Sequence, residues 1–166
     1  MRCLFILSAF TLTLAAQFAR ADDDQAACAN NAGTLITGSV VSGPTFRDGH
    51  TLQGVELSHT HVTLRSSQDG KLYDVAIDNV FASGYDSAGR SIPAPLTSIS
   101  VGTRLEVCGK PYPQGGGIDW VHTDCGDTPT TQSPDGWLKI IDAGGSVGPN
   151  LEASQEYCGI FRHRSP

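Results

Sequence analysis

Positive charge is scarce in this sequence of 166 residues, which contains 11 Lys and Arg against 17 Asp and Glu. No basic cluster interrupts this acidic background. Such a surface repels a phosphate backbone, so the composition argues against nucleic acid as a partner.

Long apolar runs are also missing beyond residue 21, so we expect no membrane span in the rest of the chain. The first 21 residues have the pattern of a secretory leader: a positive start at Met1-Arg2, an apolar stretch at Leu4–Ala16 and a small-x-small cleavage site at Ala19-Arg20-Ala21. We therefore predict cleavage near Ala21 and a secreted or periplasmic product. Losing Arg2 and Arg20 would move the net charge from −6 to about −8.

The remaining sequence alternates apolar and polar residues with a period of two, which is typical of β-strands. We predict strands at Gly33–Ser42, Val55–Arg65, Leu72–Ile77, Val101–Gly109 and Gly117–Cys125, with a weaker sixth pattern at Trp137–Ile141. Asp69-Gly70 predicts a hairpin between the second and third strands, and Gly115-Gly116-Gly117 a tight turn between the fourth and fifth. We expect a loop at Gly43–Gly54 and a helical turn at Leu151–Tyr157.

Five strands in this order, the first of them long and interrupted by Gly38, predict an all-β fold: a small OB-like Greek-key barrel. A β-sandwich is the alternative, although it would need about seven strands. The expected organisation is a signal peptide at 1–21, an N-terminal segment at 22–32, the barrel at 33–125 and an irregular C-terminal extension packed on the barrel at 126–166.

Four cysteines remain after Cys3 leaves with the leader, and an even number in an oxidising compartment predicts two disulfides. The fourth and fifth strands, paired as a hairpin, would set Cys108 opposite Cys125 and leave Cys28 to bond Cys158. The other two connectivities stay open. Zinc bound by four thiolates is poorly supported, because the chain has no Cys-x-x-Cys pair.

Histidines supply the candidate site. His59 and His61 are two residues apart on a predicted strand and therefore share a face, and His122 lies on another strand with Trp120 beside it. In OB barrels this region is the usual ligand surface, so the candidate ligand-binding residues are His59, His61, Tyr73, Trp120 and His122. The same three histidines are the candidate zinc ligands; the competing interpretation is that they are solvated or packed polar positions.

Catalytic signatures are absent: there is no Gly-x-Ser-x-Gly, no phosphate loop and no free cysteine if both disulfides form. Asp119 and Asp124 would point to opposite faces of a flat strand, so they do not form an acid–base pair. The sequence therefore predicts a binding module, without a resident cofactor, for a small molecule, a glycan or a protein. One alternative is a metal-dependent hydrolase using the histidines with Asp119 or Asp124, and the other is a structural secreted protein.

One stretch resembles a known family. Trp120-Val121-His122-Thr123-Asp124 follows a glycine-rich turn and precedes Pro134-Asp135-Gly136-Trp137-Leu138. In this order and spacing, residues 33–139 are similar to the bacterial domain-of-unknown-function 3465 family of small exported proteins. The resemblance implies export and a similar fold. It implies no activity, and the family has histidines where this chain has Asp119 and Thr123.

Overall fold

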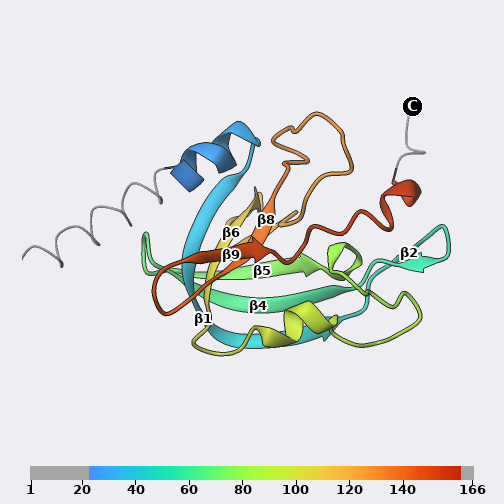
Figure 1. Cartoon of the computed structure of the whole chain (residues 1–166), viewed down its shortest axis with the longest axis horizontal. Helices are drawn as coiled ribbons and strands as arrows, with labels where there is room; N and C mark the ends of the chain where they lie inside the picture. Colours follow the sequence, from blue (N-terminus) through green and yellow to red (C-terminus); the bar gives the residue numbers. More distant parts are fainter. Residues whose placement is uncertain (1–22, 162–166) are drawn as a thin grey trace, which may run out of the picture.

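A closed ring of five strands forms the body of the molecule in the computed structural model, which describes residues 23–161. The main sheet has the order β1-β4-β5-β7-β6-β8-β9, and a further ladder between β1 and β6 closes the first five strands into a barrel (Figure 1). All neighbouring barrel strands are antiparallel except β5 and β7. The predicted OB-like barrel is confirmed. The predicted leader, residues 1–21, lies outside the described residues.

Nine strands are found in the described chain. The barrel strands are β1 (Thr34–Arg47), β4 (His59–Ser66), β5 (Leu72–Asp78), β6 (Arg104–Pro111) and β7 (Gly117–Asp119). The others are β2 (Thr51–Leu52), β3 (Val55–Glu56), β8 (Trp137–Ile141) and β9 (Val147–Asn150). Residues 23–30 are α-helical, and three 3-10 helices follow: η1 (Asn79–Phe81), η2 (Ala94–Ser98) and η3 (Cys158–Ile160).

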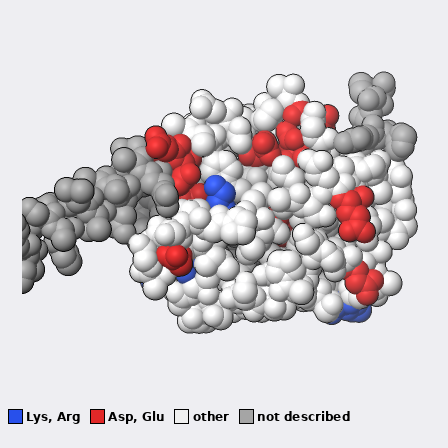
Figure 2. All heavy atoms as spheres, in the orientation of Figure 1, with Lys and Arg blue, Asp and Glu red and all other residues white. Residues whose placement is uncertain are grey.

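The surface reflects the acidic composition. Asp and Glu side chains cover more of the face in view than Lys and Arg do (Figure 2). Between residues 23 and 161 there is no helix with the length and apolar character needed to cross a membrane.

β1 belongs to two ladders, pairing with β6 over its first residues and with β4 over the remainder. Gly38 lies where the two ladders overlap, and any side chain there would collide with the carbonyl oxygen of Arg65, so glycine is needed at this bend. Two register shifts carry the strand past Pro44 to Arg47. The loop predicted at Gly43–Gly54 is therefore wrong in its first part, because bulges accommodate proline within a strand.

The hairpin of β4 and β5 forms as predicted, around Gly70 with a φ of 72°. Burial alternates along β4, where Val62 and Leu64 are 1% and 0% exposed. Val75 and Ile77 on β5 are both fully buried and join them in the core. The residues between them on each strand therefore face outward, away from the barrel interior.

β7 is much shorter than expected. The strand predicted at Gly117–Cys125 ends at Asp119, because Trp120 has a left-handed backbone conformation with a φ of 56°. The amide of Gly136 then donates to the carbonyl of His122 at 2.8 Å, so the chain after this turn runs beside the start of β8.

The disulfides join Cys28 to Cys108 and Cys125 to Cys158. Our preferred pairing of Cys108 with Cys125, and hence of Cys28 with Cys158, is wrong. It required both a longer β7 and a different register. β7 ends at Asp119, and because Lys110 pairs with Asp119, a continued ladder would set Cys108 opposite Val121 and not Cys125. Cys108 instead faces β1, beside the helical segment that carries Cys28.

The C-terminal extension begins with regular structure. β8 has the bounds predicted for the sixth strand and pairs with β6, so the segment is less irregular than expected. The helical turn predicted at Leu151–Tyr157 is wrong. In that segment the amide of Leu151 donates to Leu138 of β8 and the amide of Ser154 donates to Phe81 of η1, so these amides bond to other segments and do not form a helix.

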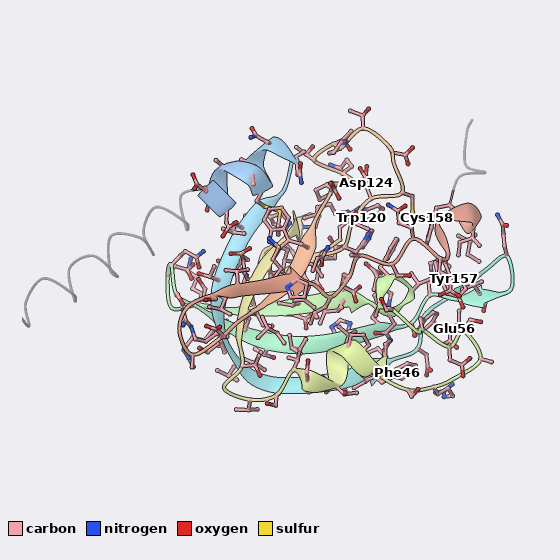
Figure 3. The ribbon with its side chains drawn as sticks, viewed as in Figure 1. Phe46, Glu56, Trp120, Asp124, Tyr157 and Cys158 are labelled. Carbon is pink, nitrogen blue, oxygen red and sulfur yellow. A yellow bond between two sulfur atoms is a disulfide. The ribbon has the colours of Figure 1, made fainter. Side chains whose placement is uncertain are left out.

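A second hydrophobic cluster holds the extension on the barrel, next to Cys158 and Tyr157 (Figure 3). Phe81 and Phe161 stack with ring centroids 5.6 Å apart. The Tyr157 hydroxyl donates to the carbonyl of Tyr85 at 3.4 Å. Packing contacts and the Cys125–Cys158 disulfide therefore both hold the end of the described chain on the barrel.

Removing the Cys28–Cys108 bond should destabilise the protein more than removing Cys125–Cys158. The bonded cysteines are 80 and 33 residues apart, respectively. Loop-closure entropy then gives about 4.5 and about 3.8 kcal/mol. We expect each Cys→Ser pair of substitutions to lower the free energy of unfolding by about 2–5 kcal/mol, as measured by guanidinium denaturation.

The disulfide connectivity can be determined by digesting the protein with its disulfides intact. Cleavage before aspartates separates the four cysteines into peptides 24–47, 86–118, 124–126 and 142–166. Mass spectrometry should find 24–47 linked to 86–118 and 124–126 linked to 142–166. A link between 86–118 and 124–126 would contradict the structure.

Candidate functional site

Imidazoles and carboxylates gather on the outer side of β4, β5 and β7. We call this surface the imidazole–carboxylate face and define it by His59, His61, Asp74, Asp78, Asp119 and His122. The hairpin register pairs His59 with Asp78 and His61 with Ala76, and the alternation that buries Val62 turns these side chains outward. Segments distant in sequence thus contribute to one surface.

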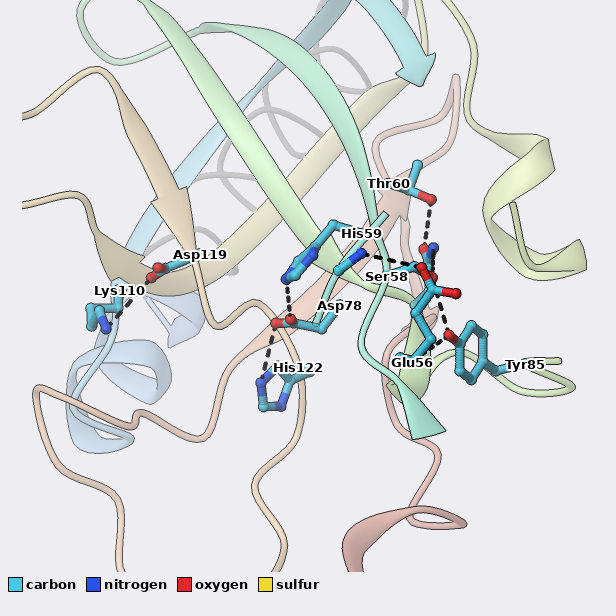
Figure 4. A network of polar contacts seen from close by, with 11 residues as sticks. Glu56, Ser58, His59, Thr60, Asp78, Tyr85, Lys110, Asp119 and His122 are labelled. Atoms are coloured by element: carbon cyan, nitrogen blue, oxygen red, sulfur yellow. Dashed lines mark hydrogen bonds and ion pairs between the residues drawn. The ribbon is translucent and has the colours of Figure 1, made fainter. Parts of the chain in front are cut away.

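Asp78 is the centre of this face. His59 Nε2 lies 2.8 Å from one of its carboxylate oxygens, and His122 Nε2 lies 3.5 Å from the other (Figure 4). The hydrogen bond to Asp78 raises the pKa of His59, although burial opposes it. Burial by itself would raise the pKa of Asp78, but the His59 hydrogen bond and the nearby imidazole charges lower it. Asp78 therefore stays ionised in a partly buried position.

His122 is held on three sides. It is 4% exposed, and its ring stacks on Phe81 with centroids 3.6 Å apart and an interplanar angle of 4°. Nδ1 lies 2.7 Å from the carbonyl oxygen of Thr123, so this nitrogen carries a hydrogen and donates it. Burial lowers the pKa of His122, while the charge of Asp78 opposes that shift. The imidazole can donate to both neighbours when it is protonated.

A second group lies further along β5. His61 Nδ1 is 3.0 Å from each carboxylate oxygen of Asp74. The hydroxyl of Tyr112 donates to the same carboxylate at 2.9 Å. Burial and the bond to Asp74 together raise the pKa of Tyr112. Tyr112 therefore remains a neutral hydrogen-bond donor on the face.

Lys110 supplies the cation beside Asp119. Its ammonium lies 3.9 Å from Asp119 Oδ1 and 5.3 Å from the centroid of the Trp120 ring. Burial raises the pKa of Asp119, although Lys110 acts in the opposite direction. The Trp120 ring also lies 5.3 Å from His122. Left-handed backbone is costly for a bulky residue and is often found at functional sites.

Glu152, from the C-terminal extension, is a buried acid near this face. It is 0% exposed, and both its carboxyl oxygens are buried with no hydrogen-bond partner in the described structure. Burial, reinforced by the charge of Asp78, raises the pKa of Glu152 well above its ordinary value. Burial therefore favours the neutral form of this carboxyl group.

The structure brings together four of the five predicted ligand residues: His59, His61, Trp120 and His122. Tyr73 is not part of this group. It pairs with Leu64, whose side chain is fully buried, so it lies on the inner side of β5, and its hydroxyl donates to Asp69 in the turn. Placing Tyr73 on the face was wrong, because side chains alternate along a strand.

Sequence reasoning did not find Asp74, Asp78, Tyr112, Lys110 or Glu152. Asp78 could have been found from the hairpin register, since any pairing around Asp69-Gly70 sets the end of β5 beside the start of β4. Glu152 gave no signal, because its burial depends on how the extension folds back.

The predicted zinc site does not assemble. Within residues 23–161, no group of three or more His, Cys, Asp and Glu has an arrangement that could hold a metal ion. His59 and His122 both direct Nε2 at Asp78, while His61 directs Nδ1 at Asp74. No observation therefore favours a metal-dependent hydrolase.

Comparisons with known proteins add no assignment. No family model, no curated protein and no solved structure matches this chain. The resemblance to the exported family described above stays a prediction.

The histidines should titrate on opposite sides of the ordinary imidazole pKa of 6.5. We expect NMR titration of the ring protons to place His59 above this value and His122 below it. In Asp78→Asn the pKa of His59 should fall by about 1, since its ion partner is removed. Asp127→Asn, at an exposed position, is the matched control and should leave both values unchanged.

Glu152→Gln should stabilise the protein at high pH. Because the folded pKa of Glu152 is raised, its contribution to stability is fully present below about pH 4.5 and is lost as the pH rises through the folded pKa. The variant should exceed the natural protein by on the order of 2 kcal/mol at pH 8 and show little difference at pH 4, measured by chemical denaturation. Glu156→Gln, at an exposed position in the same segment, should show no such pH dependence.

Proposed function

We propose that this protein is an exported binding module whose imidazole–carboxylate face holds a positively charged amine of its ligand. The observation that carries this proposal is the position of Lys110. Its ammonium lies near both the Asp119 carboxylate and the Trp120 ring. An aromatic ring beside a carboxylate is a favourable environment for an ammonium group. A cation of the chain itself therefore indicates what this surface can bind.

The charge of the face supports a cationic ligand. Asp74, Asp78 and Asp119 contribute three carboxylates, and of these Lys110 pairs with Asp119. Asp74 and Asp119 have side chains that are 39% and 36% exposed, so a ligand can reach them. The acidity of the molecule as a whole would draw cations towards this surface.

The histidines make such binding dependent on pH. When His59 and His122 are neutral, the carboxylates dominate the face. Acidification adds positive charge beside Asp78, and this opposes a cationic ligand. His59 becomes charged first because its pKa is raised, and His122 becomes charged later because burial lowers its pKa. The ligand would be held near neutral pH and released in acid.

Export is part of the same proposal. The leader pattern at residues 1–21 supports it, and two disulfides in the described chain are compatible with an oxidising compartment. Binding at a preformed surface also suits a barrel closed by hydrogen bonds and tethered by sulfur, because little of the surface must be ordered when the ligand arrives.

Spermidine is a suitable probe, titrated by calorimetry into the mature, oxidised protein at pH 7.5 in 150 mM salt. Asp119→Asn should weaken binding about tenfold, since a charge-assisted hydrogen bond contributes about 1.5–3 kcal/mol. Binding should also weaken at pH 5, where His59, whose pKa is raised, is charged.

Asp127→Asn is the matched control for spermidine, because it removes the same charge from an exposed position. It should change affinity less than twofold. Equal weakening by Asp127→Asn and Asp119→Asn would mean that spermidine senses net charge alone. That result, or no binding at all, would overturn the proposal.

A further inference from the structure

A separate cavity of about 440 Å³ opens at one end of the barrel. It lies where β1 and β5 begin and where β4 and β6 end, so it is the mouth of the barrel on that side. Its apolar wall includes Ile36, Leu72, Tyr73 and Pro111. The volume falls in the range of about 300–1,000 Å³ that is usual for small-molecule sites.

The barrel wall separates this cavity from the imidazole–carboxylate face. Tyr73 lines the cavity from the inner side of β5, whereas Asp74, the next residue, points outward to His61. Neighbouring side chains on a strand point to opposite faces, so Tyr73 and Asp74 belong to different sites. Leu72, the first residue of β5, also lines the cavity. A ligand in the cavity need not touch the histidines.

Most polar side chains around the cavity already have partners. The Gln68 amide accepts from the amide of Thr37 and donates to the carbonyl of Leu35. The Tyr73 hydroxyl donates to Asp69 at 3.0 Å. Bonding inside the protein therefore occupies these groups, which leaves the Tyr73 ring and the aliphatic side chains as the surface for a ligand.

Leu72 indicates that the cavity is incomplete without an occupant. Its side chain is 49% exposed, and it is one of three large hydrophobic residues exposed in the described chain. The other two, Val41 and Val101, do not line the cavity. Gly115 and Gly116, in the turn before β7, also line the cavity and have no side chains to cover Leu72. An apolar group of a ligand would remove this surface from water.

A lysine lies at the rim, in a protein that has few positive charges. Lys71 lines the cavity, is 75% exposed and lies 3.6 Å from Asp69. The Arg65 guanidinium binds the carbonyl of Gly70 in the same turn. Arg65 does not itself line the cavity, but with Lys71 it gives this turn two cations against the one carboxylate of Asp69, and hence a net positive charge. The turn therefore complements an anion.

We propose that the barrel mouth binds a small amphipathic monoanion, with an aromatic or aliphatic group against Leu72 and Tyr73 and its acidic group near Lys71. This site is independent of the proposed amine site, because the two are lined by different residues and favour charges of opposite sign.

The test is a fluorescence titration of the mature, oxidised protein with 8-anilinonaphthalene-1-sulfonate, an aromatic anion. Leu72→Asn should weaken binding roughly tenfold, because it removes the apolar contact. Val101→Asn also replaces an exposed aliphatic side chain with asparagine, at a position that is 66% exposed and outside the cavity, and it should leave affinity unchanged. Near-ultraviolet circular dichroism checks that both variants keep the native fold.

The charge at the rim is tested with a neutral relative of the same probe. Lys71→Gln should weaken the anion about threefold to fivefold, since an exposed charge contributes little, and leave N-phenyl-1-naphthylamine unaffected. Equal effects of Leu72→Asn and Val101→Asn, or no binding by the natural protein, would refute the site. Asp119→Asn should not alter this titration, so the amine site and this one can fail separately.

Discussion

The pairing of β1 with both β4 and β6 is the constraint on which the rest of the structure depends. This pairing closes the barrel, and it requires β1, a strand of 14 residues, to bend at Gly38. Closure gives β4 and β5 an inner side packed with aliphatic residues and an outer side free for polar ones. Both candidate sites follow from this division, one on the outer wall and one at the mouth.

The imidazole–carboxylate face shows how a charged group is retained in a partly buried position. Asp78 lies between two imidazoles, and the hydrogen bond and charges offset its desolvation. One imidazole comes from β4, while the other is held by the segment after β7 and by Phe81. Cys125, three residues after His122, is bonded to Cys158, so the C-terminal extension also helps to position this segment. The site is thus a product of long-range packing.

The sequence pattern correctly predicted those elements that depend on residues close together in the sequence. The β4–β5 hairpin has a strong turn signal at Asp69-Gly70, and β8 has a compact apolar run. The strand after Gly117 was overextended because nothing in the sequence marks Trp120 for a left-handed conformation. The cysteine pairing was wrong because it relied on both the length and the register of that strand. The sequence predicted that His59 and His122 lie on one surface. It did not predict that both contact Asp78.

β9 also affects how readily the protein would aggregate at high protein concentration. Because β1 pairs with β6, it is not an edge strand. β9 is the edge strand of the main sheet in the described chain. It is four residues long and contains Pro149, which has no amide hydrogen to offer another strand. A short edge strand that contains proline pairs poorly with a strand of a second molecule. This edge therefore protects the protein against aggregation by strand addition.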